Sequence, residues 1–192
     1  MLITQKSLKK IPQLKAIEIL NRYQQEKSFR EIVNADMTPV DLMNWMEQEK
    51  RFNELVIFLC HSLQPMEAIW WGYLCISPQV SELPEHEKKA MGVINQWLHE
   101  PIETYRRMAE IAVKRVELDN ASGWLAQAVF WSGGSITPVN GPESPAPPYL
   151  YSHAVAGAIC LAAVLPDGQQ GEKRYRQYID VGIEIANGGN GR

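Results

Sequence analysis

The sequence lacks most of the features that would identify a chemistry directly. Its three cysteines (Cys60, Cys75 and Cys160) are an odd, widely spaced set in apolar contexts, which argues against a disulfide framework and is typical of a reducing compartment. The net charge of −3 gives no basic excess that would favour nucleic acid or an anionic membrane. No apolar run is long enough to span a bilayer, and no apolar segment follows the basic start as in a secretory signal. We therefore expect a cytoplasmic protein with neither a nucleic-acid nor a membrane partner.

Signals for β-structure are also scarce. Alternation of apolar and polar residues is always short, and β-branched residues are never clustered. Apolar residues recur instead at spacings of three and four, which predicts amphipathic helices. The sequence thus predicts one all-α domain over residues 1–192. We expect a compact array of eight or nine helices, arranged either as solenoid-like pairs or as an irregular bundle.

Several helices can be located from local signals. Leu14 shares an apolar stripe in a helix expected over residues 12–25, and Thr38 is placed to cap a helix through the Asp41 amide. The clearest amphipathic segment spans residues 102–117. Its polar stripe, which we expect to face solvent, comprises Arg106, Arg107, Glu110, Lys114 and Glu117.

The least generic stretch runs from residue 120 to residue 148. A short aromatic helix ends at Gly133-Gly134, where a left-handed residue is expected to stop it. The following loop, 135–148, contains five prolines and can be neither a regular helix nor a central strand. The glycine-rich residues 187–192 are expected to form a flexible tail.

Catalytic and metal-binding patterns are sparse. No two of the four histidines share a helix face, so we expect no metal site, and no cofactor motif is present. A hydrolase that uses Ser132 or Ser135 with His153 and Asp167 is conceivable, in a cleft lined by Trp124 and Trp131. The serines are not set in a nucleophile elbow, however, because the chain there runs from a helix into a loop.

Two charged sets permit alternative functions. The basic residues Lys173, Arg174 and Arg176 open the last helix, either as a solvated face or as a contact for an acidic partner or RNA. An immunity protein that blocks a toxin would need an acidic face. The residues that supply such charge are Glu82, Glu85, Glu87, Glu100 and Glu103.

The segment Trp124-Leu-Ala-Gln-Ala-Val-Phe-Trp-Ser-Gly-Gly-Ser-Ile-Thr-Pro138 carries a resemblance. Together with the alanine-rich residues 154–163 and the glycines of 182–188, it resembles an uncharacterised all-helical family of Gram-negative bacteria that is associated with type VI secretion gene neighbourhoods. The resemblance is strongest over residues 120–188. It implies an accessory role, such as helping to load or fold an effector or a spike component, and it brings no catalytic residues.

The residues therefore favour a non-enzymatic scaffold, adaptor or chaperone-like protein that binds another protein. Proline-rich loops lose little entropy when they are ordered, and amphipathic aromatic residues beside such a loop suit a contact surface. Trp71 is a weaker candidate, because it follows Trp70 and the two cannot share one helix face. The expected contact residues are Trp131, Ser132, Ile136, Pro138, Tyr149, Tyr151 and Trp71.

Overall fold

The fold is an all-α array, described here from a computed structural model that covers residues 3, 7–34 and 36–191. These residues contain ten α-helices and one 3-10 helix, more than the eight or nine expected, and no strand. None of these helices is both long enough and apolar enough to cross a membrane. The elements are α1 (Ala16–Leu20), α2 (Lys27–Ile32), α3 (Pro39–Gln48), α4 (Phe52–Ser62), α5 (Pro65–Ile76), η1 (Ser77–Glu82), α6 (Glu85–His99), α7 (Glu103–Val116), α8 (Ala121–Phe130), α9 (Leu150–Val164) and α10 (Gly171–Ala186).

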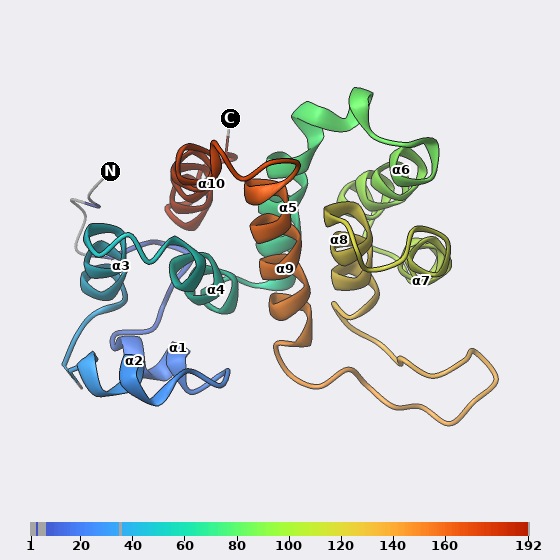
Figure 1. Ribbon diagram of the computed structural model, residues 1–192. Coiled ribbons are helices and arrows are strands. Elements are labelled where there is room, and N and C mark those ends of the chain that lie inside the picture. Colours follow the sequence, from blue (N-terminus) through green and yellow to red (C-terminus); the bar gives the residue numbers. More distant parts are fainter. Residues whose placement is uncertain (1–2, 4–6, 35, 192) are drawn as a thin grey trace.

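Helix α9 lies at the centre of the array, between the group α3, α4 and α10 and the group α6, α7 and α8 (Figure 1). It packs against α4, α5, α8 and α10, while α6, α7 and α8 pack against one another. The small side chains of α9 allow these close approaches. Gly157, for example, lies under the indole ring of Trp124 on α8.

Helix α3 begins where its sequence predicts. The Thr38 hydroxyl accepts a hydrogen bond from the Asp41 amide at 3.2 Å, and the Asp41 carboxylate accepts one from the Thr38 amide. This reciprocal cap satisfies two amides that the first helical turn leaves unpaired.

The first helix is shorter than its sequence predicts. Only Ala16–Leu20 is helical, because the amide of Ala16 donates to the carbonyl of Met37 instead of continuing a helix from residue 12. Leu14, expected on the packing face, consequently lies outside the helix and is 80% exposed. The prediction of a helix over residues 12–25 is wrong in extent.

The C-terminal residues 187–191 pack back onto the array. The Trp70 indole donates to the carbonyl of Asn190 at 2.8 Å, and the Gly189 amide donates to the carbonyl of Glu184. Arg192, the last residue of the expected tail, lies outside the described residues.

Two of the three basic residues that open α10, Arg174 and Arg176, bind other parts of the chain, whereas Lys173 is exposed. Arg174 donates to the carbonyl of Ala163 at 2.7 Å, and Arg176 forms ion pairs with Glu47 and Glu172. Both arginines are half-buried, so part of each side chain is held within the fold.

Candidate partner-binding site

Arg106 on α7 anchors the start of the proline-rich loop. Its guanidinium donates to the carbonyl of Phe130 at 2.7 Å and to the carbonyl of Ser135 at 2.9 Å. Gly134, with φ of +63°, turns the chain so that its backbone lies against the same guanidinium. The left-handed glycine was expected from the sequence, but as the end of the helix, and α8 already ends at Phe130 with Trp131 as its cap. The expectation that Arg106 faces solvent is wrong, because the residue is only 4% exposed. It is buried because it donates to the carbonyl of Phe130, which the end of α8 leaves without a helical partner, and to a carbonyl of the loop.

A second arginine extends this anchor. Arg107 donates to the carbonyl of Thr137 at 2.9 Å and forms ion pairs with Glu103 and Glu110. Glu103 also receives two hydrogen bonds from Arg106, at 2.6 and 2.7 Å. The hydrogen bond from Arg106, followed by the one from Arg107, lowers the pKa of Glu103 to about 2. The carboxylate therefore stays charged and orients both guanidinium groups toward the loop.

The loop is folded on itself beyond this anchor. Ser135 and Pro145 form an isolated antiparallel bridge, and the Ile136 amide donates to the carbonyl of Ser144 at 2.9 Å. The Thr137 hydroxyl donates to the carbonyl of Pro142 at 2.6 Å. Residues 135–145 thus form a narrow hairpin-like loop that projects from the ends of α8 and α9 (Figure 1).

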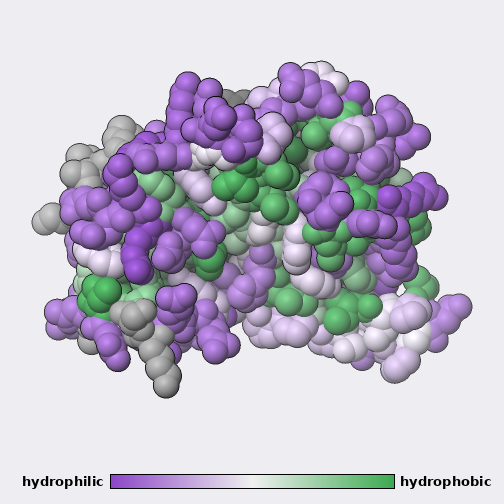
Figure 2. Space-filling view, viewed as in Figure 1, coloured by the Kyte–Doolittle hydropathy of each residue, from purple (hydrophilic) through white to green (hydrophobic). Residues whose placement is uncertain are grey.

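The end of this loop presents apolar surface to solvent. Pro138 is exposed, and Val139 exposes 79% of its surface. The loop forms the lower right corner of the molecule, where weakly polar residues replace the strongly hydrophilic ones of the upper surface (Figure 2). Val139 was not among the residues expected from the sequence, since no periodic pattern marks a single apolar side chain in a loop.

Three of the expected contact residues lie at the base of the loop and are half-buried: Trp131, Ser132 and Ile136. Trp131 is the C-terminal cap of α8 and packs partly against the core. The Ser132 hydroxyl donates to the carbonyl of Val129 at 2.8 Å. This position leaves part of each side chain open to a partner.

The two tyrosines at the far end of the loop have different positions. Tyr149 has a left-handed backbone, with φ of +61°, and its ring lies 4.8 Å from the guanidinium of Arg22. Tyr151 is buried and donates from its hydroxyl to the carbonyl of Leu63 at 2.8 Å. Tyr151 therefore fixes the start of α9 instead of forming surface, which corrects its expected place among contact residues.

Trp71 lies in the core and not on a contact surface. Its indole is fully buried between α5 and α10, and its nitrogen donates to the carbonyl of Tyr178 at 2.7 Å. The expectation that Trp71 contacts a partner is therefore corrected. Trp70 and Trp71 face different sides of α5, as expected, and the half-buried Trp70 lies nearer the surface.

The serines of the hydrolase hypothesis form hydrogen bonds with groups other than His153. Ser135 shares a hydrogen bond of 2.7 Å with the Thr137 hydroxyl and accepts another from the Ser144 amide. The ring of His153 instead packs edge-on against His61, with 4.6 Å between ring centroids. Both serines therefore help to shape the loop.

The contact between His61 and His153 joins α4 to α9 and was not expected from the spacing of the histidines. His61 is fully buried, and its Nδ1 contacts the carbonyl of Ile57 at 2.8 Å. Burial lowers the pKa of His61 from its usual 6.5 to about 4, so the ring is neutral at pH 7. Within the described residues, no three histidine, cysteine, aspartate or glutamate side chains are grouped so as to hold a metal ion.

The glutamates considered for an acidic face are divided among η1, α6 and α7 and the turn between the last two. Glu87 is buried and accepts a hydrogen bond from the Ser122 hydroxyl at 2.9 Å, so it contributes no surface charge. Glu85 lies 3.8 Å from Lys89, and Glu103 is neutralised by the two arginines. Only Glu82 and Glu100 remain as exposed members of the set without a close cation in the described part of the chain.

Searches of curated proteins and of solved structures find no match, whereas a protein-family model matches most of the chain. The model of a family of unknown function, DUF6931, matches residues 42–186, which include α4 to α10, the anchoring arginines and the loop. The chain therefore belongs to this uncharacterised family, DUF6931.

Proposed function

We propose that the protein is a non-enzymatic adaptor or chaperone-like scaffold that holds another protein through the loop 135–148 and the residues at its base. The observation that carries this proposal is that Arg106 and Arg107 hold the start of a loop whose exposed end is apolar. A loop that is already folded loses little conformational entropy when a partner binds, so more of the contact energy appears as affinity.

The contact surface in this proposal has an exposed part and a supporting part. Val139 and Pro138 supply the exposed end, with Trp131, Ser132, Ile136 and Tyr149 at the base. Tyr151, being buried, supports the surface from below. Transfer of the Val139 side chain from water into an apolar pocket of a partner would be favourable by about 25 cal/mol for each Å² of apolar surface buried.

The resemblance of residues 120–188 bears on the class of partner. That resemblance supports the more specific proposal that the partner is an effector or spike component of a type VI secretion system. The three free cysteines support a cytoplasmic location, because thiols persist in reducing compartments.

The test compares two substitutions at apolar side chains of almost equal exposure. Val139→Asp places a charge at the loop end, whereas Leu14→Asp places one at a residue that is 80% exposed but distant from the loop in sequence. The tagged proteins are purified from the native host, and bound proteins are quantified by mass spectrometry. We expect Val139→Asp to reduce recovery of a specific partner at least about tenfold, because a charge must be desolvated in an apolar contact.

Leu14→Asp should recover that partner at the wild-type level. Deletion of the loop after Ser135, combined with Trp131→Ala, should abolish recovery. If Val139→Asp and the deletion variant both recover the partner as the wild type does, the loop is not the contact surface.

A further inference from the structure

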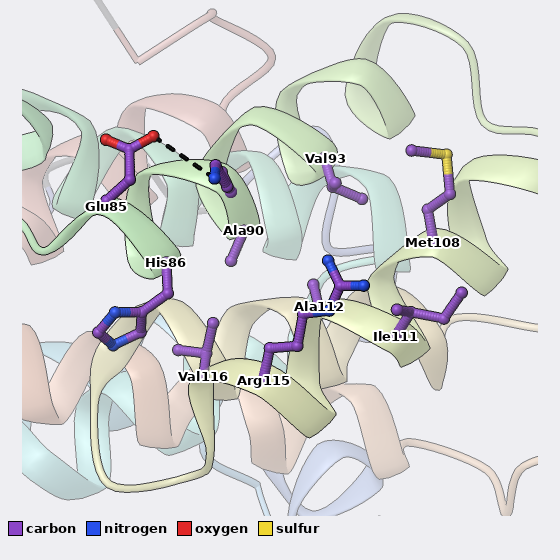
Figure 3. A pocket seen from close by; sticks show the side chains of 10 residues that line it. Glu85, His86, Ala90, Val93, Met108, Ile111, Ala112, Arg115 and Val116 are labelled. Atoms are coloured by element: carbon purple, nitrogen blue, oxygen red, sulfur yellow. Dashed lines mark ion pairs between the residues drawn. The ribbon is translucent and has the colours of Figure 1, made fainter.

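A groove between α6 and α7 forms a second apolar surface. The two helices pack side by side, and the space between their outer faces has a volume of about 490 Å³. Ala90 and Val93 of α6 face Met108 and Ile111 of α7 across it (Figure 3). None of these residues belongs to the loop 135–148.

The groove has a buried floor and exposed apolar walls. Ala90 and Val116 on the floor are almost fully buried, whereas Ile111 is 50% exposed and Met108 is 38% exposed. Small side chains below and larger exposed ones above leave room for a side chain to enter from outside. Apolar groups that line a groove in this way are a common sign of a protein contact.

One charged side chain of the groove has no partner. Arg115 of α7 is exposed and makes no ion pair within the described part of the chain, and its side chain reaches the middle of the groove beside Ala112 (Figure 3). Glu85 and Lys89 of α6 offset each other at 3.8 Å. The end away from Glu85, around Val93, Met108 and Ile111, is apolar (Figure 3). The remaining basic residues of α7 all have carboxylate partners: Arg106 with Glu103, Arg107 with Glu103 and Glu110, and Lys114 with Glu110.

We propose that this groove binds an amphipathic helix of a partner protein that carries an acidic side chain beside its apolar stripe. Met108, Ile111 and Arg115 are spaced by three and four residues, so they form one ridge along α7. A third helix that lies between such a ridge and α6 packs its own i, i+3, i+4 and i+7 residues into the groove. Its carboxylate pairs with Arg115, which fixes the register and direction of the bound helix.

The probe is a synthetic helical peptide of about 15 residues with leucines at i, i+3, i+4 and i+7 and glutamates that flank this stripe. A second peptide has lysines in place of the glutamates, and a third has the first composition in scrambled order. Binding to the full chain is measured by fluorescence anisotropy. We expect saturable binding of the glutamate peptide and at least about tenfold weaker binding of the other two.

Substitutions then locate the contact. Ile111→Asp should weaken binding of the glutamate peptide at least about tenfold, and Leu14→Asp, which is remote from the groove, should leave it unchanged. Arg115→Glu should weaken it about threefold to tenfold, and the lysine peptide should recover affinity for this variant. Ile111→Ser replaces Ile111→Asp if circular dichroism shows that the aspartate variant is unfolded.

Three results would overturn the proposal. One is the absence of saturable binding up to about 1 mM peptide, and another is equal binding by wild type and the Ile111 variant. The third is a concentration-dependent dimer in sedimentation velocity that Ile111→Asp abolishes, because a second copy of the chain would then occupy the groove. None of these results bears on the loop 135–148, whose test depends on Val139.

Discussion

Gly182 on α10 leaves the space that the indole ring of Trp71 on α5 occupies. A β-carbon at Gly182 would lie 2.6 Å from Trp71 Cε2 and 2.8 Å from Leu59 Cδ2. The contact with Trp71 cannot be relieved by a small movement, because the indole is rigid, fully buried and hydrogen-bonded to Tyr178. The close approach of α10 to α4 and α5 therefore depends on this glycine.

Gly182→Ala should destabilise the protein by about 1–3 kcal/mol, the usual cost of overpacking a well-filled core. Chemical denaturation measures this change in the free energy of unfolding. Gly92→Ala on α6 is the matched control, since a β-carbon there meets nothing within 4 Å. The control should be neutral or stabilise by up to about 1 kcal/mol, because alanine favours the helix. Equal effects of the two substitutions would contradict the proposed packing.

Arg106→Gln should release the start of the proline-rich loop. The substitution leaves the carbonyls of Phe130 and Ser135 without their charged donor, and each such loss costs about 1–3 kcal/mol. Hydrogen exchange at the Ile136 and Ser144 amides should accelerate. Lys114→Gln is the control, because its ion pair with Glu110 is on the surface and contributes about 0.5 kcal/mol or less. Unchanged exchange in Arg106→Gln would show that the loop holds its shape without α7.

Acid should destabilise the fold through His61. Its pKa is 6.5 when exposed and about 4 in the folded protein, so the unfolded chain binds more protons between these values. Stability should thus be constant above pH 6.5 and decrease as the pH falls from 6.5 toward 4, by at most about 3 kcal/mol. Denaturation curves at several pH values measure the decrease.

His61→Asn should flatten this pH dependence, although it lowers stability overall. His99→Asn is the control, because His99 makes the same contact with the carbonyl four residues before it but lies exposed at the end of α6. A decrease of the same size between pH 6.5 and 4 in His61→Asn would assign the effect to other groups.

The three thiols should react slowly in the folded protein. Burial raises the pKa of Cys60 and of Cys75 well above 9 and the pKa of Cys160 to about 11. At pH 8 the thiolate form of Cys160 is therefore about a hundredfold scarcer than in a free thiol. Titration with a disulfide reagent should show Cys160 reacting slowly, Cys60 and Cys75 more slowly still, and all three rapidly in denaturant. Rapid native reaction of Cys60 would contradict its burial.

The sequence predicted those features that depend on neighbouring residues. Thr38 and Asp41 form their cap within three residues, and Gly134 has the left-handed conformation expected of it, although α8 already ends at Phe130. The all-α class follows from the same kind of local periodicity. Leu14 shows the limit of that signal, since its spacing fits a helix that a hydrogen bond from Ala16 to Met37 prevents.

The candidate site could not be predicted in the same way, because its contacts join distant segments. Arg106 is a polar member of an amphipathic pattern and is buried only because two carbonyls, 24 and 29 residues further along the chain, need donors. His61 and His153 meet only after α4 and α9 pack together. Trp71 fits into the core because Gly182, on a helix far along the chain, leaves room for its indole ring.

The central position of α9 also affects how the chain is made. Helices α4 and α5 emerge from the ribosome before the helix that fills the space between them and α8, and the delay is roughly 4–15 s at a synthesis rate of about 5–20 residues per second. During this interval the apolar faces of α4 and α5 stay open to water or to a chaperone. A ribosome-bound chain that stops at Tyr149 should therefore be digested readily by protease, and one that includes α10 should resist.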